Sequence, residues 1–326
     1  MNRITKDSEI RNRLSKEAYI ENSSNRPVID GPIEPNKFFT TNKARTAFIT
    51  QEPYGVGDNG GWDMSKSLNA KSSLKEQNRN GLPTFKNEVK CASILNGRKD
   101  DPMSTTAYDI YKETTAVINV KKEPNCQSRS NPTELKQHTT KNSELLKEQY
   151  SNLGLTSKDT TILAGTKDCL INDVNDNTVE IFGRKFNKQT DVTSIKKGKH
   201  TYIKYDNGDG KEPIIAAPHP SASRFGQGDY ADNINEIRNK KTQREIHQNQ
   251  KGQSRQQENI RNNTHKQQKS QTSFGSSIVD IGANVCKSSL DYIKNNPKTV
   301  AFVVAGTVVV LTSGFYLYRK YKKKKH

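Results

Sequence analysis

The chain has few apolar residues and few cysteines, and both shortages limit what it can be. Apolar side chains make up 30% of its 326 residues, well below the roughly 45–50% of an ordinary globular domain. A core cannot extend over the whole chain, so we expect part of it to stay unpacked. The four cysteines, Cys91, Cys126, Cys169 and Cys286, are far apart. Their spacing excludes a disulfide scaffold and argues against a zinc site or an iron–sulfur cluster, so we expect reduced thiols, no metal and no cofactor.

Basic residues are in excess, but they are concentrated. The chain has 53 Lys and Arg against 35 Asp and Glu, a formal charge of +18. Residues 238–271 hold nine basic and two acidic side chains, and residues 319–325 hold six basic and no acidic ones. The remainder is only mildly basic, so the total charge does not by itself predict a dedicated nucleic-acid surface.

Long apolar runs are missing except at one place. No apolar stretch stands near the N-terminus, and we expect no secretory signal peptide. Thr299–Tyr318, in contrast, is a run of 20 residues without a charge. As a helix it would be about 30 Å long, the thickness of a bilayer's hydrocarbon core. Tyrosines 316, 318 and 321 and the basic tail at 319–326 are typical of a membrane interface. We predict a transmembrane helix at 299–318; the alternative is a buried core helix.

Two orientations are possible for such an anchor. The positive-inside rule places the Lys-rich tail in the cytoplasm and the rest of the chain outside. A tail anchor keeps the body cytosolic and needs no export signal. We expect the tail anchor, and therefore a single-pass membrane protein with a cytosolic body. The segment 296–299 also resembles a sortase-type cell-wall signal, which requires an exported chain.

Composition divides the rest of the chain. Residues 233–275 are rich in Gln, Asn and basic side chains and almost lack apolar ones, which predicts a disordered linker. Its charge would either contact nucleic acid or lipid headgroups or only keep it solvated. We expect a juxtamembrane segment at 276–298 and a polar, partly helical segment at 1–24. The folded body is therefore predicted at 25–232.

Four short apolar runs within this body predict buried strands: Thr46–Thr50, Cys91–Leu95, Thr160–Ala164 and Pro213–Ala217. The connections between them are too long for hairpins and favour parallel crossovers. An apolar stripe predicts a helix at Ser143–Leu153. We therefore expect an α/β fold, a three-layer sandwich with a central, mainly parallel four-stranded sheet. The polar stretches 97–142 and 171–212 are interpreted as insertions, with Val179–Phe182 and Thr201–Tyr205 pairing as a hairpin.

Polar residues follow each predicted strand. Gln51-Glu52-Pro53-Tyr54 comes after the first strand, Asn96 after the second, Gly165 after the third and His219-Pro220-Ser221 after the fourth. In open parallel sheets the functional groups gather beyond the carboxyl ends of the strands. These residues are therefore expected at one site.

The first and last of these motifs resemble those of the uracil-DNA glycosylase superfamily, over about residues 25–230. Gln51–Tyr54 is similar to the family's Gln-Asp-Pro-Tyr loop, with Glu52 where many members have Asp, and His219–Ser221 is similar to its His-Pro-Ser loop. The resemblance implies that the Gln51 backbone holds a base carbonyl, that Tyr54 closes the pocket against a 5-methyl group, and that Asn96 pairs with the uracil edge. An apolar wedge often follows the His-Pro-Ser loop in the family; Ser223, Arg224 and Phe225 occupy that region here and are expected to contact DNA.

The chemistry of such a reaction suits the same residues. Breaking an N-glycosidic bond places positive charge on the sugar and negative charge on the departing base. A carboxylate is useful beside the sugar and a hydrogen-bond donor beside the base oxygen, roles that fit Glu52 and His219. An extruded base also needs an aromatic platform, for which Trp62 is a candidate, and Ser221 completes the substrate-binding set.

Other interpretations of these residues stay open. Glu52 could be an ordinary surface acid, His219 could only fix a turn between two prolines, Asn96 before Gly97 is a common turn signature, and Trp62 could serve in packing. The leading hypothesis is a membrane-anchored DNA glycosylase-like hydrolase that removes uracil or a related damaged base from single- or double-stranded DNA. The alternatives are a noncatalytic nucleic-acid or nucleotide-binding module, or a scaffold, tethered to a membrane.

Overall fold

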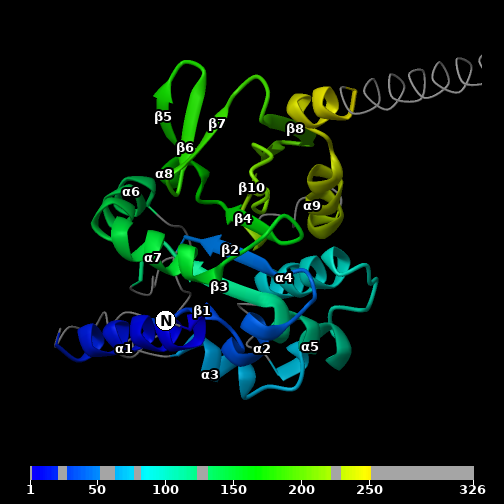
Figure 1. Cartoon of the computed structure of the whole chain (residues 1–326). Coiled ribbons are helices and arrows are strands. Elements are labelled where there is room, and N and C mark those ends of the chain that lie inside the picture. Colours follow the sequence, from blue (N-terminus) through cyan, green and yellow to red (C-terminus); the bar gives the residue numbers. More distant parts are fainter. Residues whose placement is uncertain are drawn as a thin grey trace, which may run out of the picture. The chain divides into compact units, whose positions relative to one another are not determined.

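The computed structural model in Figure 1 describes residues 2–20, 28–51, 63–76, 82–122, 131–221 and 229–250. The helices in these ranges are α1 (Arg3–Ile20), α2 (Pro35–Thr40), α3 (Met64–Asn69), η1 (Leu74–Glu76), α4 (Leu82–Leu95), α5 (Thr105–Thr114), α6 (Pro132–Lys141), α7 (Ser143–Leu153), α8 (Lys167–Leu170) and α9 (Tyr230–Asn239). The strands are β1 (Gly31–Pro32), β2 (Thr46–Thr50), β3 (Thr115–Asn119), β4 (Thr160–Ala164), β5 (Asn172–Asn175), β6 (Thr178–Ile181), β7 (Arg184–Asn187), β8 (Val192–Lys197), β9 (His200–Tyr205) and β10 (Ile214–Ala217). The predicted α/β class is confirmed.

The main sheet has seven strands in the order β1-β3-β2-β4-β10-β9-β8. The prediction of a four-stranded sheet is therefore wrong. Its four central strands, β3, β2, β4 and β10, are parallel, whereas β1 at one edge and β9 and β8 at the other pair antiparallel. Strands β1 and β8 were not predicted, because they join the sheet through long-range pairing with β3 and β9 that local patterns do not reveal.

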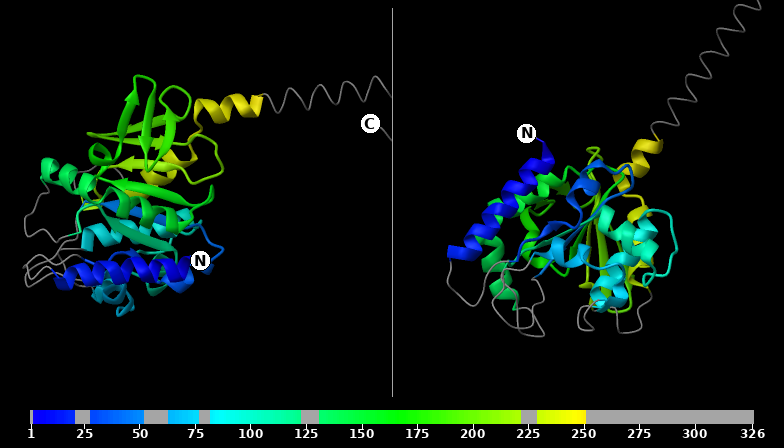
Figure 2. Two further views of the ribbon diagram at one scale, coloured as in Figure 1. Left: turned by 60° about the vertical axis from the view of Figure 1, so that its left-hand side comes forward. Right: turned by 90° about the horizontal axis from the view of Figure 1, so that it is seen from below.

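The central strands are buried on both faces, because their side chains alternate between two cores. Phe48, Val117, Ile162 and Ile215 face one core, whereas Ile49, Ile118, Leu163 and Ile214 face the other. A strand covered on both sides is expected to read as a continuous apolar run rather than an alternating one. Figure 2 shows helices on both sides of the sheet, with α4 and α5 (cyan) on one side and α6 and α7 (green) on the other.

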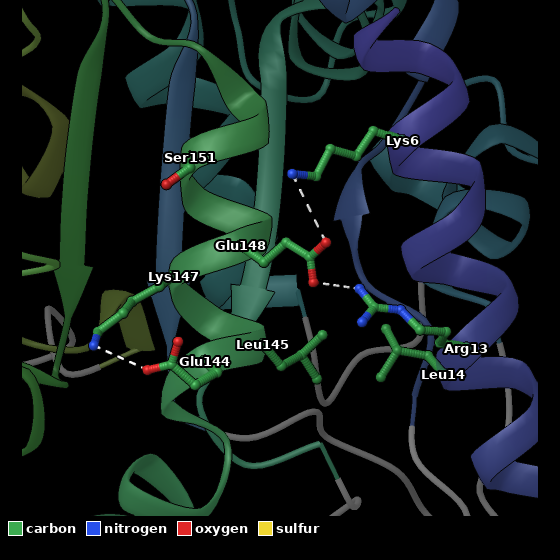
Figure 3. A pocket seen from close by; sticks show the side chains of 8 residues that line it. All are labelled: Lys6, Arg13, Leu14, Glu144, Leu145, Lys147, Glu148 and Ser151. Atoms are coloured by element: carbon green, nitrogen blue, oxygen red, sulfur yellow. Dashed lines mark hydrogen bonds and ion pairs between the residues drawn. The ribbon is translucent and has the colours of Figure 1, made fainter. Parts of the chain in front are cut away.

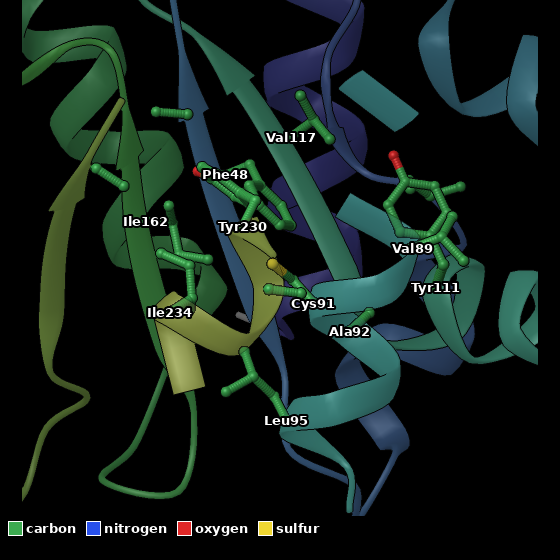
Figure 4. Packing of buried hydrophobic residues seen from close by; sticks show 14 of the residues in the cluster. Phe48, Val89, Cys91, Ala92, Leu95, Tyr111, Val117, Ile162, Tyr230 and Ile234 are labelled. Carbon is green, nitrogen blue, oxygen red and sulfur yellow. The ribbon is translucent and has the colours of Figure 1, made fainter. Parts of the chain in front are cut away.

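Figure 4 shows the first of these cores, where α4, α5 and α9 pack on the sheet. Val89 and Ala92 of α4, Tyr111 of α5 and Ile234 of α9 are completely buried there. The predicted strand at Cys91–Leu95 is wrong, since these residues form the last part of α4. The spacing of Phe85, Val89 and Ala92 is helical, and a short apolar run alone does not distinguish a strand from a buried helix.

The second parallel strand is instead β3, Thr115–Asn119, whose five residues are all buried. It follows α5 directly, with Thr115 already in an extended conformation at the helix C-cap. No Gly or Pro separates the two elements, so the sequence carries no turn signal at this boundary.

The helix predicted at Ser143–Leu153 is confirmed as α7. It ends at Gly154, whose φ of 54° is the left-handed conformation that glycine adopts most easily. Helix α1 packs against α7 and buries Ile10 and Leu14. Part of the polar segment expected at 1–24 is therefore docked on the body.

The stretch 171–212 contains five strands and is not a simple insertion. β5, β6 and β7 form a separate three-stranded antiparallel sheet, and β8 and β9 extend the main sheet. The predicted pairing of Val179–Phe182 with Thr201–Tyr205 is wrong, because β6 pairs with β5 and β7 whereas β9 pairs with β8 and β10.

The body continues beyond residue 232, where the linker was predicted to begin. Helix α9 buries Ile234 and Ile237 completely. Residues 243–250 are helical as well, and Thr242 and Glu245 cap this helix reciprocally, with each side chain accepting the other's backbone N–H at 3.3 and 2.6 Å. The remainder of the predicted linker, the juxtamembrane segment, the apolar run at 299–318 and the basic tail lie outside the described residues. In the part of the chain that is described, no helix is long and apolar enough to cross a bilayer.

Candidate active site

The pairing register brings the ends of the four parallel strands to one level. Thr50 of β2 pairs with Asn119 of β3, Ile49 pairs with Leu163 of β4, and Ala164 pairs with Ala217 of β10. Thr50, Asn119, Ala164 and Ala217 therefore form one row across the sheet. We call this row, together with the residues that immediately follow each strand, the strand-end rim.

Gly165 is the meeting point of the first and last motifs on this rim. The Gln51 amide Nε2 donates a hydrogen bond to the Gly165 carbonyl at 2.8 Å, and the Gly165 amide donates to the Ala217 carbonyl at 2.9 Å. A Cβ at position 165 would lie 3.1 Å from Gln51 Nε2, 3.2 Å from His219 Cβ and 3.3 Å from His219 N. Glycine is required here both by this close approach and by a φ of +73°.

His219 is held by its own loop. The Ser221 backbone amide donates to His219 Nδ1 at 3.2 Å, and the Ser221 hydroxyl lies 2.7 Å from the same nitrogen. A ring nitrogen that accepts a hydrogen bond carries no proton in the neutral imidazole. We therefore assign the proton of neutral His219 to Nε2. The loop is fixed in turn by α4, because the Asn87 amide donates to the Pro220 carbonyl at 2.6 Å.

Asn119, at the end of β3, takes the place on the rim that was predicted for Asn96. Its side chain is almost fully buried, at 1% exposure. The Thr50 hydroxyl donates to Asn119 Oδ1 at 2.7 Å, and Asn119 Nδ2 donates to Asp30 Oδ2 at 3.2 Å. The Asn119 backbone amide also donates to Asp30 Oδ2, at 2.6 Å. Because Thr50 donates and the Asp30 carboxylate accepts, the orientation of the Asn119 side-chain amide is fixed.

Asp30 belongs to a buried polar cluster with Lys122 and Gln149. Lys122 Nζ lies 2.9–3.0 Å from both Asp30 carboxylate oxygens and 2.8 Å from Gln149 Oε1. Gln149 Nε2 donates to Asp30 Oδ1 at 2.8 Å. All three side chains are at most 4% exposed. A buried pair of opposite charges that also forms hydrogen bonds is tolerated in a protein interior, whereas either charge alone would be strongly destabilising.

A second buried carboxyl, Glu88 of α4, lies within the apolar core and accepts a hydrogen bond from the Tyr111 hydroxyl at 2.7 Å. Burial raises the pKa of Glu88 to about 7, although the Tyr111 hydrogen bond acts in the opposite direction. Its neighbours Val89 and Tyr111 are buried core residues, so we assign Glu88 to the core rather than to the site.

A groove between α1 and α7 is unrelated to the strand-end rim (Figure 3). Glu148 of α7 occupies its centre, 3.8 Å from Lys6 Nζ and ion-paired with Arg13. Both ion pairs join α1 to α7, and we assign the groove to the docking of α1.

The structure brings together some of the predicted site residues. Gln51, His219 and Ser221 meet at the rim as expected. Asn96 does not: it follows α4 at the opposite end of the parallel strands, where its amide exchanges hydrogen bonds of 3.0 Å with the backbone N–H and C=O of Ala44. Its predicted position after a strand is wrong because the segment before it is helical. The remaining candidates, Glu52, Tyr54, Trp62, Ser223, Arg224 and Phe225, lie outside the described residues.

Asn119, Asp30 and Lys122 were missed by the sequence argument. A signal for Asn119 does exist, since the β-branched run at 115–118 ends in this polar residue. No local signal pairs Asp30 with Lys122, which is 92 residues away. Within the described ranges, no three His, Cys, Asp or Glu side chains gather in a way that could hold a metal ion.

Comparisons of this chain with protein-family models, with curated proteins and with solved structures find no match. The function therefore has to be argued from the geometry of the rim.

Proposed function

We propose that the chain is a DNA glycosylase-like hydrolase that removes uracil or a related damaged base from DNA. The observation that carries this proposal is the meeting of Gln51 and His219 at Gly165. Two short motifs separated by more than 160 residues of sequence thus reach one small region of the rim. Both motifs follow parallel strands, and the order β2-β4-β10 places them on either side of β4.

The proposed reaction needs a carboxylate and a donor on opposite sides of a nucleoside. The C1′–N bond breaks with its electron pair passing to the base, and water adds at C1′ with loss of a proton. Glu52 follows Gln51 directly in the sequence and is the carboxylate of this proposal. It would stabilise the positive charge on the sugar and orient the water. The Nε2–H group assigned to His219 would donate a hydrogen bond to the base oxygen that gains negative charge, and the proton lost by the water would pass to the released base.

The fixed amide of Asn119 supports uracil as the base. An asparagine side chain has two donor and two acceptor positions, and Asp30 and Thr50 use one of each. One donor and one acceptor remain, as the O4 and N3–H edge of uracil requires. Cytosine presents the reverse order, and Asn119 could match it only by exchanging its oxygen and nitrogen. Asp30 cannot donate to an oxygen in that position, so the rotation would be disfavoured.

The membrane tether belongs to the same proposal. The uncharged run at 299–318 is long enough to span a bilayer, and the segment between it and residue 250 would let the folded body range away from the surface. We propose a single-pass protein whose catalytic body lies on the cytosolic side.

The test is incubation of the full chain with single- and double-stranded oligonucleotides that contain one uracil, followed by alkaline cleavage of abasic sites. We expect cleaved product from the unaltered chain and none above background from Glu52→Gln or His219→Ala. Exposed His247 provides a matched control, and His247→Ala is expected to retain activity. Asn119→Ala is expected to lose activity, and Asn96→Ala to retain it in proportion to its folded fraction.

Two outcomes would overturn the proposal. Tight DNA binding without product from the unaltered chain would indicate a noncatalytic binding module. Product that survives both the Glu52 and the His219 substitutions would show that the chemistry lies elsewhere on the chain.

A further inference from the structure

The turn between β8 and β9 extends past the strand-end rim. β9 runs antiparallel to β10, with Ala216 paired to Ile203, so Ala217 at the end of β10 is level with Tyr202. Lys199 is three residues further along the strand direction. At about 3.4 Å per residue, it stands roughly 10 Å beyond the end of β10, past the same end of the strands as His219.

This turn is tight and well supported. β8 and β9 are paired up to Lys197 and His200, which leaves a two-residue connection of Gly198 and Lys199. Gly198 has a φ of +58°, as tight hairpin turns require. Lys197 is anchored to α9 by an ion pair of 2.8 Å with Glu236. The hairpin thus presents its remaining basic side chains from a paired, anchored scaffold.

Three lysines around the rim have no ion pair with any described residue. Lys196 and Lys199 belong to the hairpin, and Lys167 follows Gly165 and Thr166 at the end of β4. All three side chains are exposed. Asp168 is the acidic neighbour of Lys167 in sequence, and it forms no ion pair with these lysines. Three lysines and this one aspartate leave an excess of two positive charges beside the rim.

We propose that Lys167, Lys196 and Lys199 bind phosphates of the DNA strand on either side of the nucleotide in the site. This inference rests on the proposed function. A DNA strand carries one negative charge per nucleotide, so lysines spread over roughly 10 Å between the end of β10 and the hairpin tip would face consecutive phosphates. Lysine contacts to phosphates position the strand without reading its sequence, as an enzyme acting on scattered lesions requires.

The test measures binding of the full chain to a fluorescent single-stranded oligonucleotide without uracil, by anisotropy between 50 and 200 mM salt. The variant is the triple substitution Lys167→Gln, Lys196→Gln and Lys199→Gln. Its matched control removes three exposed lysines near the opposite end of the parallel strands, namely Lys99, Lys158 and Lys211. These lysines also form no ion pair with the described residues. Both variants lose the same net charge.

Each phosphate contact on a single strand contributes about 0.7 to the slope of log affinity against log salt. We expect the triple variant to lose about two units of slope. The factor by which its DNA affinity falls between 50 and 200 mM salt is then about twentyfold smaller than for the unaltered chain. The control is expected to keep the original slope, because its three lysines lie away from the rim. Any contribution of the basic residues at 238–271 is the same in all three proteins.

Equal slopes for the triple variant and its control would overturn the inference. So would a triple variant that binds DNA normally but loses binding to vesicles containing anionic lipid, because the lysines would then serve the membrane surface. The oligonucleotide contains no uracil, so a failure of the glycosylase assay leaves this measurement intact. The two proposals can therefore fail separately.

Discussion

Replacing Gly165 by alanine tests whether the contact between Gln51, Gly165 and His219 determines activity. The new methyl group would lie 3.1–3.3 Å from atoms of Gln51 and His219, closer than ordinary van der Waals contact, so both must shift by a few tenths of an ångström. A misplacement of 1 Å can reduce catalysis by about 100-fold. A shift of 0.3–0.5 Å is then expected to cost roughly fivefold to tenfold in kcat/KM.

The substitution also has a cost that is independent of the site. A non-glycine residue in the left-handed region is destabilised by about 1–2 kcal/mol, which corresponds to about 2–8 °C in Tm for a body of this size. Gly97 separates the two effects, because it has the same φ of +73° but no atom lies within 4 Å of the place that a Cβ would take. Gly97→Ala is expected to lower Tm by a similar amount and to leave activity unchanged.

The assay is uracil release from a single-stranded oligonucleotide under kcat/KM conditions, together with thermal unfolding of both variants. Reduced activity in Gly165→Ala alone supports the contact. Equal activity in the two variants would refute the reasoning, since the strain would then have been absorbed without moving Gln51 or His219.

Three further predictions concern stability. Asp30→Asn removes the carboxylate that faces the buried Lys122 ammonium and is expected to lower the free energy of unfolding by about 3–5 kcal/mol. The double variant Asp30→Asn, Lys122→Met is expected to recover most of this free energy, as measured by urea unfolding. An equal loss of stability in both variants would contradict the charge argument. The folded pKa of Glu88, about 7, is above its usual value of 4.5, so the stability that protonated Glu88 contributes is fully present below pH 4.5 and is lost as pH rises to about 7. Glu88→Gln is expected to remove this loss of about 3 kcal/mol, so the urea midpoint of the variant should fall less between pH 5 and pH 8 than that of the unaltered chain. A chain ending at residue 232 lacks the buried isoleucines of α9 and is expected to unfold at room temperature, whereas one ending at residue 250 keeps a cooperative thermal transition by circular dichroism.

The parts of the fold that could be predicted from sequence are those with a strong local pattern. Strands β2, β4 and β10 are short apolar runs bounded by polar residues, and α7 has a clear apolar stripe with Gly154 at its end. The strand predicted at Cys91–Leu95 was wrong because a short, mostly apolar run at the end of a buried helix looks the same as one in a buried strand. β3 was missed because it continues directly from α5. The antiparallel edge strands depend on pairing partners that no local pattern specifies.

The candidate site could likewise be predicted only where its residues follow strands with a strong local pattern. Gln51, His219 and Ser221 follow strands that were correctly placed, so their convergence could be expected from the rule that loops after parallel strands meet. Asp30 and Lys122 could not be found in this way. Neither follows a predicted strand, and in isolation each is an ordinary charged residue. Only the folded chain shows that they are buried together beside Asn119.

The strand order explains why Asn119, and not Asn96, must be the rim amide. β3 lies beside β2 with Thr50 opposite Asn119, so a residue ending β3 is automatically a neighbour of the Gln51 motif. Asn96 is instead bonded to Ala44, before β2 begins. Six residues of extended chain separate Ala44 from Thr50, or about 20 Å. No side-chain movement closes that distance, so a ligand bound by Gln51 and His219 would lie beside Asn119 and out of reach of Asn96.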